Sequence, residues 1–225
     1  MIKIKNLHKS YGTKDLETPV LRGIDLEVPA GEFLGIMGKS GAGKSTLMYQ
    51  IGLLDHPTSG EIILNNVSTE KLTTEERTAM RLFELGYVFQ DYALIPELSA
   101  SENVIIPLLM QGKSKEEAKK IGEDILTKVG LVYRKDNKPS QLSGGEQQSV
   151  SIARAMAHNP KILFADEPTT NLDTASGLSI VELFRDLNEK GQTIVMVTHE
   201  EEYAKYCHRI VYLEDGKIVK ETRQK

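Results

Sequence analysis

The chain has 225 residues, of which 40% are apolar and 27% are charged, and its formal net charge is −4. This length suits one domain with its own core, and the acidic balance argues against a dedicated nucleic-acid binder, which would show a basic face. The single cysteine, Cys207, excludes an internal disulfide and indicates a reducing compartment, with the thiol as a small buried apolar group.

No apolar run approaches the roughly 20 residues that are needed to cross a bilayer. The first residues, 1–5, alternate like a strand and lack the apolar core of a signal peptide. If the protein works at a membrane, we expect another subunit to hold it there.

Two alternating segments come first in the chain. Ile2–Leu7 and Val20–Val28 alternate apolar and polar residues with period two, which predicts strands with one buried face. We expect these strands to be antiparallel and to precede a short buried strand, Phe33–Met37. Tyr11 lies between the two segments, where an aromatic ring is usually a packing residue.

A glycine-rich loop follows the apolar run and reads Gly38-Lys39-Ser40-Gly41-Ala42-Gly43-Lys44-Ser45-Thr46. It matches G-x-x-x-x-G-K-S, the phosphate-binding P-loop, in the required setting of strand, turn and helix. Glycines let the main chain approach a polyphosphate, and the N–H groups at the start of the next helix bind the anion. Lys44 adds a charge for the β- and γ-phosphates, and Ser45 can ligate Mg²⁺. A chance glycine-rich turn is the much weaker alternative. With a nucleotide bound, Tyr11 has the chemistry to stack on adenine.

Beyond the P-loop helix, Glu61–Asn66 predicts a strand and turn. Thr73 and Glu76 have the spacing of a capping box, which predicts a helix that runs to about Leu85. Gly86–Gln90 then reads as a buried strand. The last residue of this strand, Gln90, could ligate Mg²⁺ through its amide oxygen. A loop hydrogen bond is an equally simple explanation for a polar residue there.

Residues 91–159 are mainly helical in pattern. We expect Ser101-Glu102-Asn103 to cap an apolar helix, Val104–Met110, and Ser114 to begin a second helix that Gly130 ends. Because this stretch separates two strands of an α/β core, it predicts a helical subdomain.

A second anion-binding pattern lies at Leu142–Glu146, where Ser143-Gly144-Gly145 opens a predicted helix over residues 147–158. A capping hydroxyl, glycine N–H groups and the positive end of the helix dipole all favour an anion. An ordinary glycine-rich N-cap is the alternative. Since one P-loop needs no second phosphate site, we infer that this one serves the nucleotide held by another copy of the chain.

Two carboxylates end the next buried strand, residues 161–167. Asp166 is expected to hold Mg²⁺ and Glu167 to polarise the attacking water, because the carboxyl ends of such strands face the ligand. A helix, Thr174–Lys190, and a strand, Thr193–His199, follow, and His199 can contact the γ-phosphate or orient the water. A hairpin is predicted over residues 209–219. The remaining histidines have surface-like settings and no assigned role: His8, His56, His158 and His208.

Taken together, these motifs resemble the ATP-binding cassette of ABC proteins along the whole chain. The resemblance implies one domain, residues 1–225, with an α/β P-loop NTPase core (about 1–90 and 160–225), a mainly parallel sheet, an N-terminal antiparallel β subdomain and a helical signature subdomain (about 91–159). It implies ATP and Mg²⁺ as cofactors. It implies a head-to-tail homodimer in which each ATP lies between one P-loop and the partner's signature.

The resemblance also implies the site residues. Catalysis would fall to Lys44, Glu167 and His199, and Mg²⁺ to Ser45, Gln90 and Asp166. Nucleotide binding would fall to Tyr11, Gly38, Lys39, Ser40, Gly41, Ala42, Gly43, Lys44, Ser45, Thr46, Gln90, Ser143, Gly144, Gly145, Glu146 and Asp173.

Within the family, residues 89–96, 102–109 and 166–173 look like the lipoprotein-releasing and macrolide-export type of ATPase subunit. That likeness implies a separately encoded permease that docks near Gln90 to Gly130 and holds the chain on the cytoplasmic face of the membrane. Export or extraction of a lipoprotein, macrolide or peptide would follow. A regulatory ATPase that signals through a membrane partner is the alternative. A soluble repair or translation protein would bring a coiled-coil insertion or a second cassette, and the chain has neither.

Three positions depart from the family pattern. Lys39 replaces the usual proline of the P-loop, and Glu146 replaces the commoner glutamine of the signature. Ser149 stands where arginine or lysine is usual, so a charge contact of the signature helix is missing. We expect this last departure to bear on turnover or coupling rather than on nucleotide binding.

Overall fold

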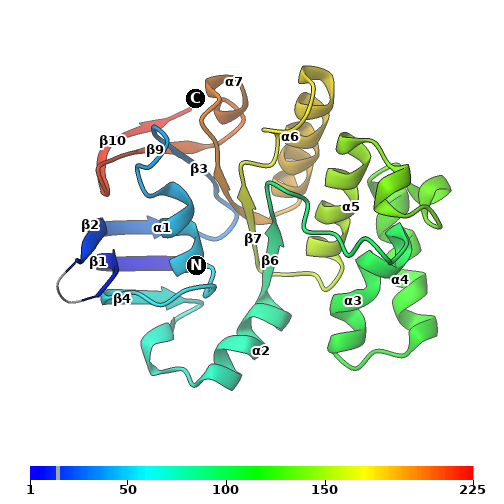
Figure 1. Cartoon of the computed structure of the whole chain (residues 1–225), viewed down its shortest axis with the longest axis horizontal. Coiled ribbons are helices and arrows are strands. Elements are labelled where there is room, and N and C mark those ends of the chain that lie inside the picture. Colours follow the sequence, from blue (N-terminus) through cyan, green and yellow to red (C-terminus); the bar gives the residue numbers. More distant parts are fainter. Residues whose placement is uncertain (14–15, 225) are drawn as a thin grey trace.

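The computed structural model describes residues 1–13 and 16–224. Within them the strands form two sheets, and the P-loop helix packs between the sheets (Figure 1). The first sheet is antiparallel, in the order β2–β1–β4–β5. Its strands are β1 (Ile2–Tyr11), β2 (Thr18–Val28), β4 (Ser59–Leu64) and β5 (Val67–Ser68).

The second sheet has the order β10–β9–β3–β8–β7–β6. All neighbours are parallel except β10, which pairs antiparallel with β9 at one edge. Its strands are β3 (Phe33–Met37), β6 (Leu85–Val88), β7 (Ile162–Asp166), β8 (Thr193–Val197), β9 (Arg209–Glu214) and β10 (Lys217–Arg223). Every residue of β3, β7 and β8 is buried, as expected of parallel strands that are covered on both faces.

Helices cover the second sheet and extend beyond its β6 edge (Figure 1). The α-helices are α1 (Lys44–Ile51), α2 (Thr74–Glu84), α3 (Ala100–Met110), α4 (Lys115–Lys128), α5 (Gly144–Met156), α6 (Thr174–Glu189) and α7 (Glu201–Ala204). Short 3₁₀ turns span Thr69–Lys71, Val132–Arg134 and Pro139–Gln141. Among the described residues, no helix combines the length and apolarity that crossing a membrane would take.

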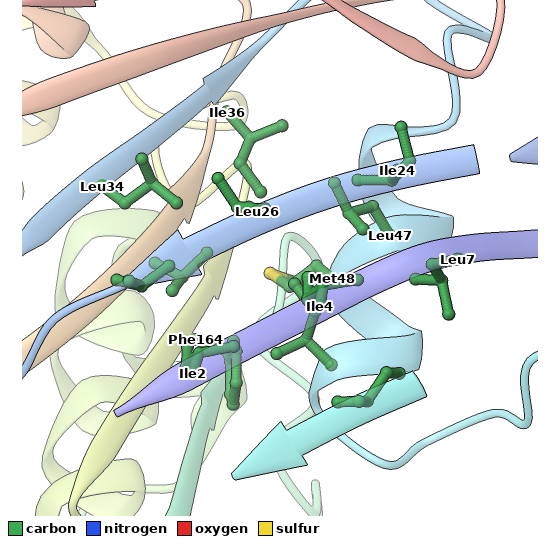
Figure 2. Close-up of a cluster of buried hydrophobic side chains, with 14 of the residues drawn as sticks. Ile2, Ile4, Leu7, Ile24, Leu26, Leu34, Ile36, Leu47, Met48 and Phe164 are labelled. Atoms are coloured by element: carbon green, nitrogen blue, oxygen red, sulfur yellow. The ribbon is translucent and has the colours of Figure 1, made fainter. Parts of the chain in front are cut away.

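The largest apolar cluster joins the two sheets through α1 (Figure 2). Ile4 and Leu26 point from the first sheet toward Leu47 and Met48 of α1, and Phe164 of β7 reaches the same cluster. These side chains are almost fully buried. The P-loop helix is therefore fixed by apolar packing on two sides, which holds its N-terminus in place at the site.

A second cluster fills the opposite face of the second sheet, under α5, α6 and α7. A third joins α3, α4 and α5 with Leu131, Leu142 and Ala157 from the segments around them. Cys207 is buried in the second cluster, as predicted, and burial raises the pKa of its thiol far above the ordinary value.

The predicted strands and helices are confirmed with shifted ends, and two local predictions were wrong. Ser99, rather than Ser101, caps α3. Ser99 forms a capping box with Glu102, which lies three residues after it. His158 is not a surface residue: it is half-buried, its Nε2 lies 2.9 Å from the Leu85 carbonyl oxygen, and burial lowers its pKa.

Candidate active site

The P-loop leads from β3 into α1, as the sequence predicted. Gly43 is the N-cap of α1 with a left-handed φ of 99°. Gly38 has a φ of +153°, and a Cβ built there would lie 2.2 Å from the Leu213 carbonyl oxygen of β9. The loop can pass this close to β9 only because Gly38 has no side chain.

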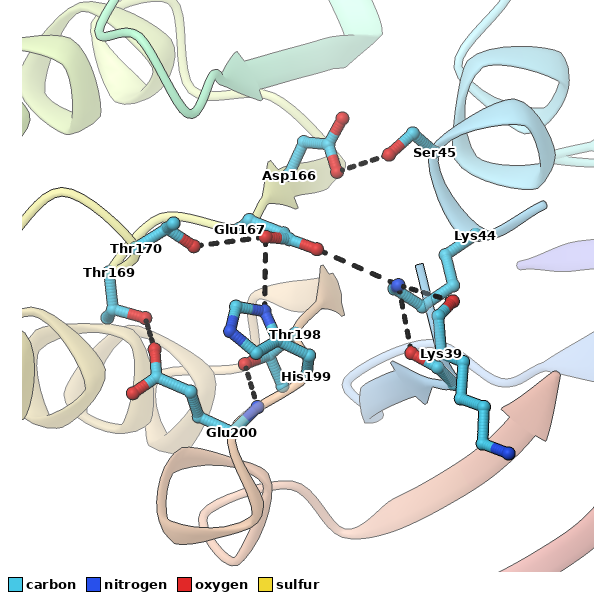
Figure 3. A network of polar contacts seen from close by, with 11 residues as sticks. Lys39, Lys44, Ser45, Asp166, Glu167, Thr169, Thr170, Thr198, His199 and Glu200 are labelled. Atoms are coloured by element: carbon cyan, nitrogen blue, oxygen red, sulfur yellow. Dashed lines mark hydrogen bonds and ion pairs between the residues drawn. The ribbon is translucent and has the colours of Figure 1, made fainter. Parts of the chain in front are cut away.

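Lys44 lies inside the curve of this loop. Its side chain is only 6% exposed, and its ammonium donates to the carbonyl oxygens of Gly38 (3.0 Å) and Lys39 (3.3 Å). The Oε1 atom of Glu167 lies 3.7 Å from the same nitrogen (Figure 3). A buried ammonium needs such partners, since an unpaired one would be expensive to desolvate.

Ser45 and Asp166 meet across the gap between α1 and the end of β7. The Ser45 hydroxyl donates to Asp166 Oδ1 at 2.9 Å (Figure 3). Burial raises the pKa of Asp166, the Ser45 hydrogen bond opposes that change, and the neighbouring Glu167 adds to it. Two hard oxygen ligands beside a phosphate-binding loop fit Mg²⁺, which prefers one or two protein oxygens together with substrate phosphates.

Glu167 follows β7 in a left-handed conformation, with φ 45°, and its N–H donates to the Val197 carbonyl oxygen. This main-chain bond turns the carboxylate toward the P-loop. Its Oε2 accepts from the Thr170 hydroxyl at 3.0 Å and lies 3.2 Å from His199 Nδ1 (Figure 3). Left-handed non-glycine residues cluster at functional sites, where the surrounding structure holds them.

A cavity of about 730 Å³ opens onto Lys44, Glu167 and His199, whereas Ser45 and Asp166 do not line it. Six of its lining residues were predicted from the sequence: Gly38, Lys39, Ser40, Lys44, Glu167 and His199. Met37 of β3, Glu201 of α7 and Tyr212 of β9 also line the cavity and were missed. Tyr212 is brought in by strand pairing, since it lies beside Met37 in the register of β9 with β3, and local sequence carries no signal for that pairing.

Gln90 lies two residues beyond β6, in an exposed turn. Its carbonyl oxygen accepts a hydrogen bond of 3.0 Å from the Asn171 side chain. This contact ties the segment after β6 to the loop after Glu167. The magnesium-binding role of the Gln90 side chain stays a prediction.

The signature segment forms the N-terminus of α5. Ser143 accepts from the Glu146 N–H, and the Glu146 carboxylate accepts from the Ser143 N–H, so the two form a capping box. Glu146 also pairs with Arg134 at 3.1 Å. The segment lines a cavity of about 200 Å³ with Ser149 and Ser176, and this cavity shares no lining residue with the P-loop cavity.

The P-loop cavity and the cavity beside the signature segment therefore have no lining residue in common within one chain. In Figure 1, α5 lies on the far side of β6 and β7 from α1. Asp173, another predicted nucleotide contact, caps α6: its carboxylate accepts from the Ser176 N–H (3.0 Å) and hydroxyl (2.7 Å). These hydrogen bonds lower the pKa of Asp173. Its contact with nucleotide stays a prediction.

Tyr11 ends β1 and is 44% exposed. Its hydroxyl donates to Asp55 Oδ2 at 2.8 Å. Burial first, and then the Asp55 carboxylate, raise the pKa of the phenol. The ring is thus anchored at its tip but open to a stacking partner.

An apolar groove of about 440 Å³ lies between α2, β6, α3 and α5. Leu54, Leu82, Tyr87, Pro107 and Met110 supply much of its lining. Its charged lining residues are Arg81 and Arg154, and His158 lies beside them. Met110, at the end of α3, is 65% exposed.

Comparisons with known proteins identify the family of the chain. Residues 21–170 match the family model described as "ABC transporter". The chain is 51% identical over 202 residues to the lipoprotein-releasing system ATP-binding protein LolD of Aquifex aeolicus, with 90% of each chain covered. It is 44% identical to the macrolide export ATP-binding/permease protein MacB of Syntrophobacter fumaroxidans, of which it spans 32%.

Solved structures give the same result. The chain is similar to the ATP-binding cassette MJ0796 in a dimeric, post-hydrolysis state bound to ADP and Pi, with a TM-score of 0.93 and 43% identity. The match covers 100% of this chain and 99% of that one. The chain therefore belongs to the ABC transporter family, as an ATPase cassette with lipoprotein-releasing and macrolide-export relatives.

Proposed function

We propose that two copies of the chain bind two ATP molecules between them and drive a separately encoded membrane permease. The separation of the P-loop cavity from the Ser143 segment carries this proposal. Both are predicted to bind anions, and they line separate cavities of one molecule. A head-to-tail pair would bring each P-loop against the partner copy's signature segment, and the dimers of MJ0796 support such a pair.

The residues around the P-loop divide the chemistry among them. Lys44 and the loop N–H groups neutralise charge as the γ-phosphoryl group leaves. Glu167 accepts a proton from, or orients, the attacking water, and His199 holds the Glu167 carboxylate and the γ-phosphate in register. Ser45 and Asp166, with Gln90, would hold Mg²⁺, which when bound neutralises the β- and γ-phosphate oxygens.

The permease is proposed to dock in the apolar groove between α2 and α3, on a helical subdomain of residues 91–159. Three features support this position. The groove is apolar and open, the exposed end of α3 extends it, and the adjoining Gln90 segment is tied to Asn171. Docking there would place the chain on the cytoplasmic face of the membrane.

The cargo is proposed to be a lipoprotein, macrolide or peptide, since LolD is named for lipoprotein release and MacB for macrolide export. The alternative is a regulatory ATPase that pulls on a membrane partner without transport. These two functions would use the same residues of the site, so only the membrane partner can distinguish one function from the other.

The decisive experiment is to identify the permease that co-purifies with the chain and to reconstitute the two in vesicles. ATP-dependent movement or release of a lipid-modified or macrocyclic cargo supports an exporter, and ATP turnover with no cargo movement supports the regulatory alternative. A chain that stays monomeric with ATP, Mg²⁺ and its permease, even as Glu167→Gln, would contradict the proposed dimer.

A further inference from the structure

A cluster of polar side chains surrounds Asp55, which follows the P-loop helix. Oδ2 of Asp55 accepts from the Tyr11 hydroxyl at 2.8 Å and from Gln50 Nε2 at 2.9 Å. Oδ1 accepts from Lys9 Nζ at 3.0 Å and from the His56 N–H at 2.7 Å. Both oxygens of this carboxylate are therefore occupied by donors from β1, from α1 and from its own turn.

Lys9 belongs to the same cluster and is buried at 9% exposure. Its ammonium also donates to the His56 carbonyl oxygen at 2.7 Å and lies over the Tyr11 ring, 4.6 Å from the ring centroid. Lys9 and Tyr11 are two residues apart on β1, so their side chains share one face of the strand. The ammonium covers one face of the ring, and Tyr11 as a whole remains 44% exposed.

These two contacts restrain different motions of the ring. The Tyr11 hydroxyl lies on the axis about which the ring rotates, so its hydrogen bond to Asp55 fixes where the ring points but not the plane of the ring. The Lys9 ammonium restrains that plane, because a cation is attracted to the face of an aromatic ring and not to its edge. Asp55 holds both partners and thereby restrains both motions.

We propose that Asp55 is a positioning residue for adenine, which holds the Tyr11 ring through the phenol and through Lys9 in a plane ready to stack on the base. The inference rests on the proposed role of Tyr11 in nucleotide binding. It adds a residue that touches no nucleotide atom. Ordering a side chain before binding removes an entropy cost that corresponds to about a two- to tenfold change in affinity.

The cluster is built to keep Asp55 ionised. Burial opposes ionisation, but the hydrogen bonds from Lys9, the His56 amide, Tyr11 and Gln50 outweigh it and lower the Asp55 pKa to about 2. The carboxylate is therefore a permanent acceptor at neutral pH.

The test compares ATP with inorganic tripolyphosphate, which offers the phosphates without the base. Binding of both is measured by calorimetry with Mg²⁺ for Glu167→Gln, in which slow hydrolysis leaves the heat of binding readable, and for the same chain carrying Tyr11→Phe or Asp55→Asn. We expect each variant to weaken ATP binding about two- to tenfold and to leave tripolyphosphate binding unchanged. With Glu167 intact, KM for ATP should rise while kcat at saturating ATP stays constant, because the ring takes no part in the chemical step.

A double variant tests whether the two residues act as a unit. Asp55→Asn with Tyr11→Phe should bind ATP no more weakly than the poorer single variant. Asp25→Asn is the matched control, since Asp25 also accepts a hydrogen bond in the first sheet, from the Asn6 N–H, but has no contact with Tyr11. It should leave the affinities for ATP and tripolyphosphate unchanged.

Two results would overturn the inference. Equal loss of ATP and tripolyphosphate binding would show that Asp55 acts on the P-loop helix through Gln50, and unchanged ATP binding would show that the ring needs no anchor. Tyr11→Ala separates a failure of the positioning inference from a failure of the adenine-stacking role of Tyr11. If Tyr11→Ala weakens ATP binding but Asp55→Asn does not, only the positioning inference fails. If neither weakens it, the adenine-stacking role of Tyr11 fails as well.

Discussion

The Lys44 ammonium lies 3.7 Å from the Glu167 carboxylate, so the proposed phosphate-binding cation and the proposed base face each other directly. A γ-phosphate would enter between them and compete with Glu167 for Lys44. The negative charge of Glu167 therefore weakens the binding of ATP, because it repels the γ-phosphate. The same charge is needed for the proposed role of Glu167 as the base in hydrolysis.

From this opposition we predict that Glu167→Gln binds ATP at least as tightly as the wild type. Hydrolysis should fall by about 10²- to 10⁴-fold, the usual contribution of a general base. Phosphate release measures the loss, and size-exclusion chromatography with ATP and Mg²⁺ should show a stable dimer. Normal turnover in this variant would remove Glu167 from the mechanism.

Complementation tests whether the signature segment acts on the partner's nucleotide. Ser143→Arg and Lys44→Ala should each be inactive alone, because every site in those dimers lacks one component. An equal mixture should recover about a quarter of the wild-type rate, since half of the dimers are mixed and each mixed dimer has one intact site. No recovery, in a mixture that does form dimers, would place both components on one chain.

Ser149 offers a gain-of-function test. Its hydroxyl donates to the Gly145 carbonyl oxygen, and it lines the small cavity beside α6. We predict that Ser149→Arg raises the turnover rate about two- to fivefold, the value of one partly exposed charge contact, with little effect on ATP affinity. Ser149→Gln is the control for side-chain length, and an equal gain in that variant would rule out the charge.

The lowered pKa of Asp55 predicts that the fold loses stability as the pH falls below about 5. Its pKa is about 2 in the folded chain and about 3.9 when unfolded, so the ionised carboxylate stabilises the fold fully above about pH 5. That contribution is lost as the pH falls through 4 toward 2. Urea unfolding should show Asp55→Asn to be less stable than the wild type at pH 6, with a difference that shrinks toward pH 2. A constant difference would mean that Asp55 acts through its shape alone.

Gly38 and Gly41 should respond differently to alanine. A Cβ at Gly38 meets the Leu213 carbonyl oxygen, whereas a Cβ at Gly41 meets nothing within 4 Å. Gly38→Ala should lower the melting temperature more than Gly41→Ala, which carries only the strain of its left-handed φ, about 1–2 kcal/mol. Melting curves recorded without nucleotide provide the measurement, and equal losses would contradict the difference.

Much of the fold followed from patterns that are local in sequence. Each of these patterns involves only a few consecutive residues. Examples are the capping box at Thr73 and Glu76, the turn of the predicted hairpin at Asp215-Gly216, and the buried runs of β3, β7 and β8. The start of α3 was misplaced although the sequence carried the signal: Ser99 and Glu102 have capping-box spacing, whereas the residue three positions after Ser101 is Val104. Helix α7, with four residues, is too short to show a helical period.

The site divides in the same way. The P-loop and the carboxylates after β7 were readable because strand ends of a parallel sheet meet at one edge. The contact of Asp55 with Tyr11 joins residues 44 positions apart, and that of Asn171 with Gln90 joins residues 81 apart. Such pairs depend on how separate elements pack, so the sequence alone could not predict them.

The crowding at Gly38 also bears on how such a chain can diverge. Because the obstacle is a main-chain oxygen of β9, no change of neighbouring side chains can make room for a larger residue there. A descendant that had abandoned ATP altogether would still gain stability from keeping this glycine. Replacing Gly41 meets no such obstacle and costs only the strain of its left-handed φ, so the loss of Gly41 is the better mark of a cassette that has given up its nucleotide.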